Sequence, residues 1–296
     1  MTRTHAITGS AVALAAIAIA IMAASNEPTA ERAIAPSPPT ARESEAIDSP
    51  WDLPLERYAV DYPLYVATVG AILGNCVEES GYQYPLSQWD ISNSEPATHT
   101  RLGHRDLTPE IAAQYGYRDA PDQRRVKDAP DIPVPDDAEY QRAFTACLTK
   151  AKSTIPEPAA GSDLLGRMNQ ASLERTQADK QVVSATIRWE HCMSSRLEEL
   201  GINAGTPEEL RGAVLEKEDA RLNRGTVDTL SLEPSAVEKK IAIEDATCQH
   251  DAGLRSTYLR VLTQEQRNIL ERKPEEFQKL GRIAAAIDDA IQQTFG

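Results

Sequence analysis

Residues 182–200 read VVSATIRWEHCMSSRLEEL, and this stretch decides the fold class. Its apolar residues follow one another by three and four, which places a tryptophan and a thiol on one face of a helix: Val182, Ala185, Trp189 and Cys192. A second cysteine, Cys248, lies in an equally helical segment, Ile241–Leu254. The sequence therefore predicts two amphipathic helices that a disulfide could join.

The same helical spacing recurs along the chain around Cys76 and Cys147, and from Asp163 to Leu200 as one long helix. Helix-start signals stand at Thr108-Pro109, at Thr206-Pro207 and at Ser235 with Glu238; the last opens a long periodic run that Lys273-Pro274 should break. No stretch alternates with a period of two between hairpin turns, so strands should be minor or absent. We predict an all-α, antiparallel helical array of two related halves.

Composition restricts the function classes. The chain has 296 residues, of which 41 % are hydrophobic, enough for a core. Its formal net charge is −14, from 45 acidic and 31 basic residues. This excess repels phosphates, so we expect no nucleic-acid partner and no binding to an anionic membrane surface.

The amino terminus indicates export. Arg3 precedes an uncharged segment, Ala6–Ala24, and Ala23-Ala24-Ser25 fits a cleavage site with small residues, so residues 1–25 read as a signal peptide. The 19 uncharged residues also just suffice to span a bilayer, which leaves an uncleaved anchor as the alternative. Contact with a membrane is expected only through this segment.

Three further regions follow. Residues 26–57 are rich in proline and polar residues and read as a disordered linker. We expect a first helical half at 58–160, with a surface loop at 117–135, and a second helical half at 161–296.

Four cysteines in an exported chain indicate disulfides. The surroundings of Cys76 resemble those of Cys192, since Gly81-Tyr82 follows the first and Gly201-Ile202 the second. Cys147 and Cys248 each come late in their half. This internal similarity predicts the pairs Cys76–Cys147 and Cys192–Cys248.

A zinc site is the alternative for the second pair, because His191 adjoins Cys192 and His250 follows Cys248 by two residues. Adjacent residues on a helix point about 100° apart, so this spacing does not favour a shared ligand sphere. We predict no metal site. We also expect His99 and His104 to be an exposed pair rather than ligands.

No motif for catalysis or for a cofactor stands out, so we predict no catalytic residue and no cofactor. The adjacent acids Glu78-Glu79 and Glu244-Asp245 diverge on a helix and would not meet at one substrate atom. Asp245 is expected to be a semi-buried structural acid, hydrogen-bonded to a neighbouring helix or loop. Trp189 and Tyr258 are expected to be core anchors around the second disulfide.

The chain resembles a family of uncharacterised exported actinobacterial proteins. The residues that carry the resemblance are Trp189-Glu190-His191-Cys192-Met193, Thr206-Pro207, Ile241–Cys248 and Gly253-Leu254 in the second half, and Cys76, Gly81–Pro85, Tyr115-Gly116-Tyr117 and Cys147 in the first. The resemblance implies a helical, disulfide-linked envelope protein and supplies no catalytic residues. Such proteins tend to be encoded near ABC-type export components.

These observations lead to two hypotheses. The first is a noncatalytic envelope protein that binds an unidentified envelope protein through helix faces, with an export system as one candidate assembly. The second is a hydrolase of cell-wall glycan with an acidic site, which requires two carboxylates in one pocket.

Overall fold

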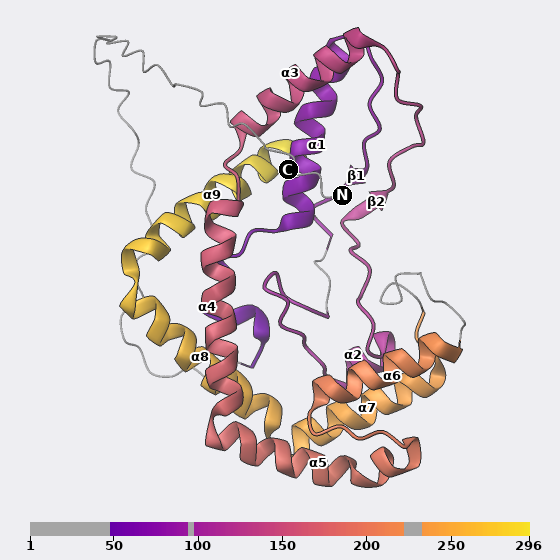
Figure 1. Cartoon of the computed structure of the whole chain (residues 1–296), viewed down its shortest axis with the longest axis vertical. Coiled ribbons are helices and arrows are strands. Elements are labelled where there is room, and N and C mark those ends of the chain that lie inside the picture. The colour runs from indigo at the N-terminus through magenta and orange to yellow at the C-terminus, as the bar shows by residue number, and fades with distance from the viewer. Residues whose placement is uncertain (1–47, 94–97, 222–232) are drawn as a thin grey trace, which may run out of the picture. The chain divides into compact units, whose positions relative to one another are not determined.

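The structure, a computed structural model, describes residues 48–93, 98–221 and 233–296, except for the side chains of residues 159–162 and 221. These residues form nine α-helices and a two-stranded sheet (Figure 1), which confirms the all-α prediction. The helices are α1 (Tyr62–Glu79), α2 (Pro109–Tyr115), α3 (Ala138–Thr154), α4 (Ala159–Ala178), α5 (Lys180–Leu200), α6 (Pro207–Arg221), α7 (Ala236–Asp251), α8 (Leu254–Arg272) and α9 (Pro274–Phe295).

The predicted helix starts are confirmed. The Thr108 hydroxyl accepts the Ile111 N–H at the start of α2, and the Ser235 hydroxyl accepts the Glu238 N–H at the start of α7. Thr206 caps α6 in the same way. The break at Pro274 separates α8 from α9 as expected.

Two predicted helices are each divided. The expected helix Asp163–Leu200 is wrong, since α4 ends before Asp179, whose extended backbone (φ −66°, ψ 133°) lets its side chain cap α5. The run that begins after Ser235 stops at Gly253, whose φ of +64° is left-handed and starts α8 in a new direction. A periodic apolar pattern does not reveal such a turn, because the apolar residues keep a helical spacing both before and after it.

Strands are minor, as predicted. β1 (Gln88–Trp89) pairs antiparallel with β2 (Arg125–Lys127), which lies within the segment expected to be a surface loop. Arg124, next to β2, is buried and donates to Asp61 at 2.6 Å, so this part of the loop is fastened to the start of α1. The expectation that residues 117–135 form only a surface loop is therefore wrong for this part.

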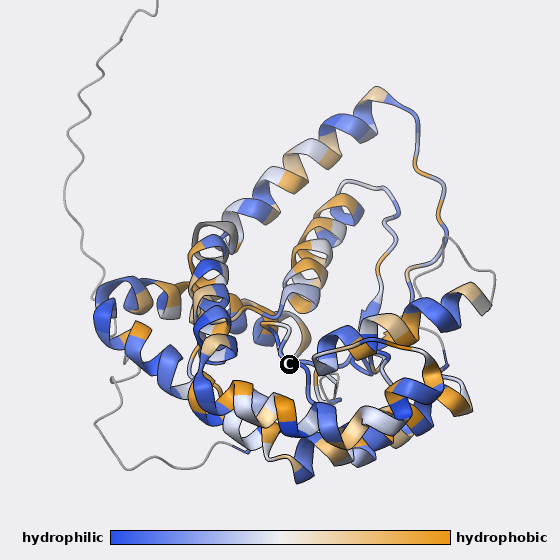
Figure 2. Ribbon diagram, turned by 60° about the horizontal axis from the view of Figure 1, so that its bottom comes forward, coloured by the Kyte–Doolittle hydropathy of each residue, from blue (hydrophilic) through white to orange (hydrophobic). Residues whose placement is uncertain are grey.

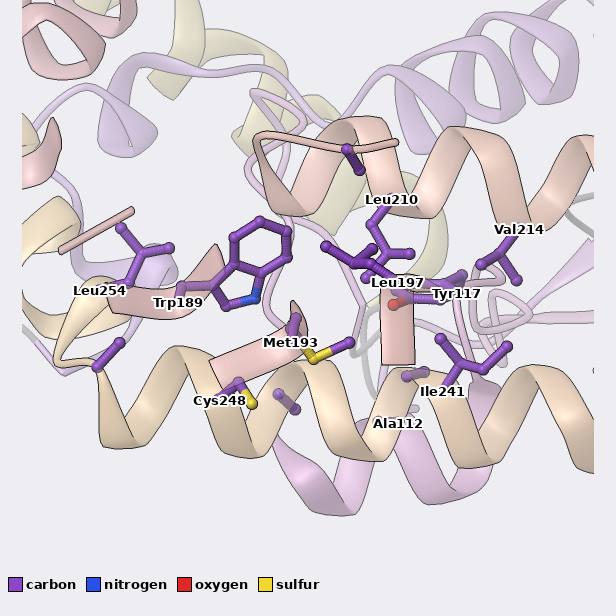
Figure 3. Close-up of a cluster of buried hydrophobic side chains, with 14 of the residues drawn as sticks. Ala112, Tyr117, Trp189, Met193, Leu197, Leu210, Val214, Ile241, Cys248 and Leu254 are labelled. Carbon is purple, nitrogen blue, oxygen red and sulfur yellow. The ribbon is translucent and has the colours of Figure 1, made fainter. Parts of the chain in front are cut away.

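α5 and α7 pack antiparallel. Three contacts recur every four residues along their seam: Arg188 with the Ala252 carbonyl, Cys192 with Cys248, and Arg196 with Glu244. On the other side of the seam, Trp189 and Met193 of α5 face the α6 residue Leu210 within a buried cluster (Figure 3). The disulfide thus lies at the edge of this hydrophobic core, with Cys248 inside the buried cluster and Cys192 exposed.

α1 and α3 form the second disulfide-linked pair. Both predicted disulfides are confirmed, with Cα–Cα distances of 5.6 Å for Cys76–Cys147 and 5.7 Å for Cys192–Cys248. Aromatic rings surround the first: Tyr82 meets Tyr140 edge-on at 5.2 Å between ring centroids. Two disulfides indicate that the protein folds in an oxidising environment.

The glycine turns after the first cysteine of each half are equivalent. Gly81 and Gly201 both have positive φ, +88° and +57°. The next residue closes the helix with the same bond, Tyr82 N–H to the Val77 carbonyl and Ile202 N–H to the Leu197 carbonyl. The extra helical turn after Cys192 therefore lengthens the helix without changing how it ends.

Each predicted half contains one disulfide, but helices of the two halves pack against each other. α1 of the first half packs on α9, and α2 of the first half packs on α7. Ile155 and Leu64 share a buried cluster with Ile287 of α9. The boundary expected near residue 160 is therefore no boundary between packing units.

The predicted linker also needs correction at its carboxyl end. Residues 50–52 and 56–58 form single 3-10 turns, and Leu53 and Leu55 are buried. The Leu55 N–H donates to the Gln266 side chain of α8 at 3.0 Å. The two leucines supply the apolar burial that we expected this proline-rich segment to lack. Residues 1–47, with the predicted signal or anchor, lie outside the described residues.

Among the described residues, one helical segment, Glu56–Glu79, which contains α1, is long and apolar enough to cross a membrane by length and composition. A core helix meets the same criterion, and α1 packs on α3 and α9. Figure 2 shows that hydrophilic and hydrophobic residues are mixed within the helices. Such mixing is typical of helices with one buried side.

Candidate functional site

A fully buried carboxylate, Asp245, lies on α7 where this helix meets α5 and the segment after α2. It accepts three hydrogen bonds, from Trp189 Nε1 (2.7 Å), the Tyr117 hydroxyl (2.9 Å) and Gln249 Nε2 (3.0 Å). A buried carboxylate without partners would be strongly unfavourable. The three donors offset that cost and join three elements at one side chain.

A second fully buried carboxylate, Glu238, lies two turns earlier on α7. It accepts the Tyr117 backbone N–H at 3.0 Å and forms an ion pair with Arg118, with 2.9 Å between Arg118 Nη2 and Glu238 Oε2. Arg118 is itself almost completely buried. Consecutive residues, Tyr117 and Arg118, are therefore held by two acids of one helix.

Gly116 brings these two residues into place. It ends α2 after seven residues with a φ of +57°, a conformation that favours glycine. A Cβ atom at this position would lie 2.8 Å from Glu238 Oε1 and 2.9 Å from Pro234 Cβ. The glycine is thus required both by the turn and by the close approach of the backbone to α7.

Arginines hold the carbonyl side of the same segment. Arg105 Nη2 donates to the Tyr117 and Arg118 carbonyls at 3.0 and 3.1 Å, and Arg211 Nε of α6 donates to the Tyr117 carbonyl at 3.3 Å. The segment 116–118 therefore has partners for its side chains, its N–H and its carbonyls. We call Tyr117, Arg118, Trp189, Glu238 and Asp245 the buried network.

Burial dominates the electrostatics of the buried network. It raises the pKa of Asp245 to about 6, although the bonds from Gln249, Trp189 and Tyr117 act in the opposite direction. The pKa of Tyr117 is raised by burial and by the charge of Asp245, so its phenol stays protonated and remains a donor. At neutral pH the network holds a carboxylate, the form that accepts all three bonds.

The structure places the predicted anchors as follows. Trp189 is fully buried in the core beside the second disulfide, and Asp245 is fully rather than semi-buried. Tyr258 of α8 is partly buried against the same core. Its burial and the charge of Glu208 raise its pKa to about 12.

The other candidate acids do not join the buried network. Glu78 and Glu79 are exposed at the end of α1. Glu244 forms an ion pair with Arg196 across the α5–α7 seam, on the side away from Asp245. As the helix geometry predicted, Glu244 and Asp245 diverge.

The expectation of an exposed histidine pair is wrong for His104. His104 is buried, its Nε2 lies 3.0 Å from Asn169 Oδ1 of α4, and burial lowers its pKa. His99 is only part-exposed, with Nδ1 3.7 Å from Asp119. The polar segment around them gave no periodic signal, so its burial under α4 could not be read from the sequence.

The residues considered for zinc are placed otherwise. The sulfurs of Cys192 and Cys248 are bonded to each other, and His191 and His250 are exposed. Within the described ranges, no three His, Cys, Asp or Glu residues are grouped as metal ligands.

Sequence reasoning missed the roles of Tyr117, Arg118 and Glu238. The sequence predicts a capping-box residue at Glu238, and its N–H is indeed capped by Ser235, but its side chain turns to the segment after α2. The available signal was the Tyr115-Gly116-Tyr117 motif, in which a glycine between tyrosines marks a tight turn.

Comparison of the chain with protein-family models, with curated proteins and with solved structures gives no match. The chemistry therefore rests on geometry. Both buried carboxylates have internal donors and neither is exposed to solvent, so a substrate would have to displace these donors to reach them. The arrangement fits a connection between helices.

Proposed function

We propose that this protein is an exported, noncatalytic protein of the cell envelope, released or anchored through residues 6–24, that binds another envelope protein through a helix face. The proposal combines the export signal in the sequence, the two disulfides and the internal use of the buried acids. The observation that carries the binding role is an exposed apolar patch on α1.

This α1 patch consists of Tyr62, Tyr65 and Val66. Tyr62 is 63 % exposed and Val66 50 % exposed, although both lie in the first turns of an otherwise core helix. The Tyr62 and Tyr65 rings lie 6.0 Å apart between centroids. Spacings of three and four residues with aromatic side chains are typical of helix faces that enter an apolar groove.

The partner class follows from chemistry. An apolar patch with two tyrosine rings fits an envelope protein that offers an apolar groove with acceptors at its rim for the phenol groups. An export assembly is one such partner, and only the family resemblance points to it. Asp245 and Glu238 do not favour the alternative of a glycan hydrolase, since both are enclosed.

Site-specific photocrosslinking tests the proposal. A photoreactive residue at Val66, in cells that export the full chain, should give a reproducible adduct with an envelope protein. The matched position Glu79, exposed on the same helix, should not give it. The adduct should disappear when Tyr62→Ser is added, while circular dichroism of the purified variant stays unchanged.

Equal adducts from both positions, or an adduct that persists in Tyr62→Ser, would contradict binding through the α1 patch. Cleavage of cell-wall glycan by the purified protein would contradict the noncatalytic role independently of the crosslinks.

A further inference from the structure

The two disulfides differ in exposure. Cys192 is exposed on α5, whereas its partner Cys248 is 8 % exposed. In the first disulfide, Cys76 is half-buried and Cys147 is 3 % exposed among aromatic rings. Of the four cysteines, Cys192 is therefore the one most exposed to an external thiol.

The charges around the two disulfides differ as well. Arg188 and Arg196 lie one turn before and one turn after Cys192 on α5, on the seam with α7. Arg196 is compensated by Glu244, whereas Arg188 has no carboxylate at ion-pair distance among the described residues and donates to the Ala252 carbonyl. The corresponding neighbours of Cys76 are Ile72 and Ser80, which carry no charge. A guanidinium next to a disulfide favours the thiolates that attack it and leave from it.

We propose that Cys192–Cys248 is a thiol–disulfide exchange site, at which the thiolate of an external dithiol attacks the sulfur of Cys192. A bond forms between the dithiol and Cys192, and the Cys192–Cys248 bond breaks with its electron pair on Cys248, which takes a proton from water. The second thiol of the dithiol then displaces Cys192 as a thiolate. The dithiol is oxidised to its disulfide, and the protein is reduced by two electrons.

The contacts along the seam allow this reaction without separating the helices. The Arg188–Ala252 and Arg196–Glu244 contacts lie on either side of the disulfide. The Trp189–Asp245 bond connects the same two helices inside the core. Opening of the disulfide therefore removes one of several links, and α5 remains on α7.

The test uses the full, oxidised chain in native buffer with dithiothreitol as the dithiol. Samples are quenched with N-ethylmaleimide at intervals, and each cysteine peptide is quantified by mass spectrometry. Cys192 and Cys248 should be labelled at least about ten-fold faster than Cys76 and Cys147, because exposure and local charge control thiol exchange. The first disulfide serves as an internal reference, since reduction through global unfolding would expose both pairs at one rate. Equal rates, or faster labelling of Cys76 and Cys147, would overturn the proposal.

A monothiol identifies the attacked sulfur. With glutathione in place of the dithiol, the trapped mixed disulfide should be found on Cys192 and the alkylated thiol on Cys248. The opposite arrangement would overturn the assignment of Cys192.

Variants of Arg188 separate charge from structure. Arg188→Gln should slow the exchange by about three-fold through loss of local positive charge, and Arg188→Lys should keep the original rate. Arg260→Gln, a matched change on α8, should have no effect. An unchanged or faster rate in Arg188→Gln would remove Arg188 from the mechanism.

Discussion

Asp245 illustrates how one side chain can depend on distant parts of the chain. Its two oxygens receive an indole N–H, a phenol and an amide from residues at positions 189, 117 and 249. On protonation, one carboxyl oxygen becomes a donor, and the group keeps less acceptor capacity for the three donors that surround it. The protonation state of this residue therefore changes the balance of donors and acceptors inside the buried network.

Tyr117→Phe removes one donor while the ring keeps its place. We expect a loss of about 1–3 kcal/mol in the free energy of unfolding, because a buried acceptor loses a partner. Urea unfolding followed by circular dichroism measures it. Tyr140→Phe, at a buried tyrosine outside the buried network, is the control and should cost less. A loss in Tyr117→Phe no larger than in the control would contradict the importance of the bond.

The raised pKa of Asp245 makes stability depend on pH. Its folded-state pKa of about 6 lies above its ordinary value of 3.8, so the folded state binds more protons between these values. The stabilisation is present in full below the lower value and is lost as the pH rises through the higher one. Between these two limits, the contribution of Asp245 to the free energy of unfolding changes by about 3 kcal/mol.

Asp245→Asn isolates this effect, since asparagine resembles the protonated acid and does not titrate. Unfolding free energies of both proteins across this pH range should show the wild type losing stability relative to the variant as the pH rises. Taking the difference between the two proteins cancels the contribution of His104. Its lowered pKa makes stability rise with pH below its ordinary value of 6.5, which is opposite to the effect of Asp245. A constant difference between the two curves would show that Asp245 does not titrate in this range.

At the scale of elements, short segments between helices decide how the helices meet. Asp179 divides α4 from α5, Gly253 divides α7 from α8, and Gly116 directs the chain from α2 into the buried network. Each is a single residue with a backbone conformation or cap that the adjoining helices cannot supply.

Gly116→Ala tests the turn after α2. The Cβ atom would meet Glu238 and the backbone would keep a left-handed φ, so we expect a loss of about 1–3 kcal/mol. Gly166→Ala is the matched control, because Gly166 lies within α4 with open space around its Cα, and alanine should stabilise by about 0.5–1 kcal/mol. Thermal melting compares the two. Similar melting temperatures for both variants would contradict the steric argument.

At the scale of the whole molecule, the start of the described chain completes cores formed by its end. Leu55 packs with α4, α8 and α9, and its N–H binds Gln266. Glu56 accepts hydrogen bonds from the Thr100 hydroxyl and from the Leu102 N–H. This segment thus connects residues far apart in the sequence.

Leu55→Ala should cost about 2–5 kcal/mol, as expected for a fully buried leucine. Val126→Ala, at an exposed position of β2, should change stability by less than about 0.5 kcal/mol. Guanidinium unfolding of both variants gives the comparison. A small effect at Leu55 would mean that the segment adds little to the fold.

The sequence by itself determined the helical class, most helix starts and the two disulfide pairs, because caps, spacing and internal similarity are local or repeated signals. It also predicts that Trp189, Asp245 and Tyr258 are structural residues. It did not indicate that Leu55 is buried, that His104 lies against Asn169, or that Glu238 holds Tyr117 and Arg118. Only the tertiary structure decided these, because each depends on a contact between residues at least 65 positions apart, and no local pattern records the partner.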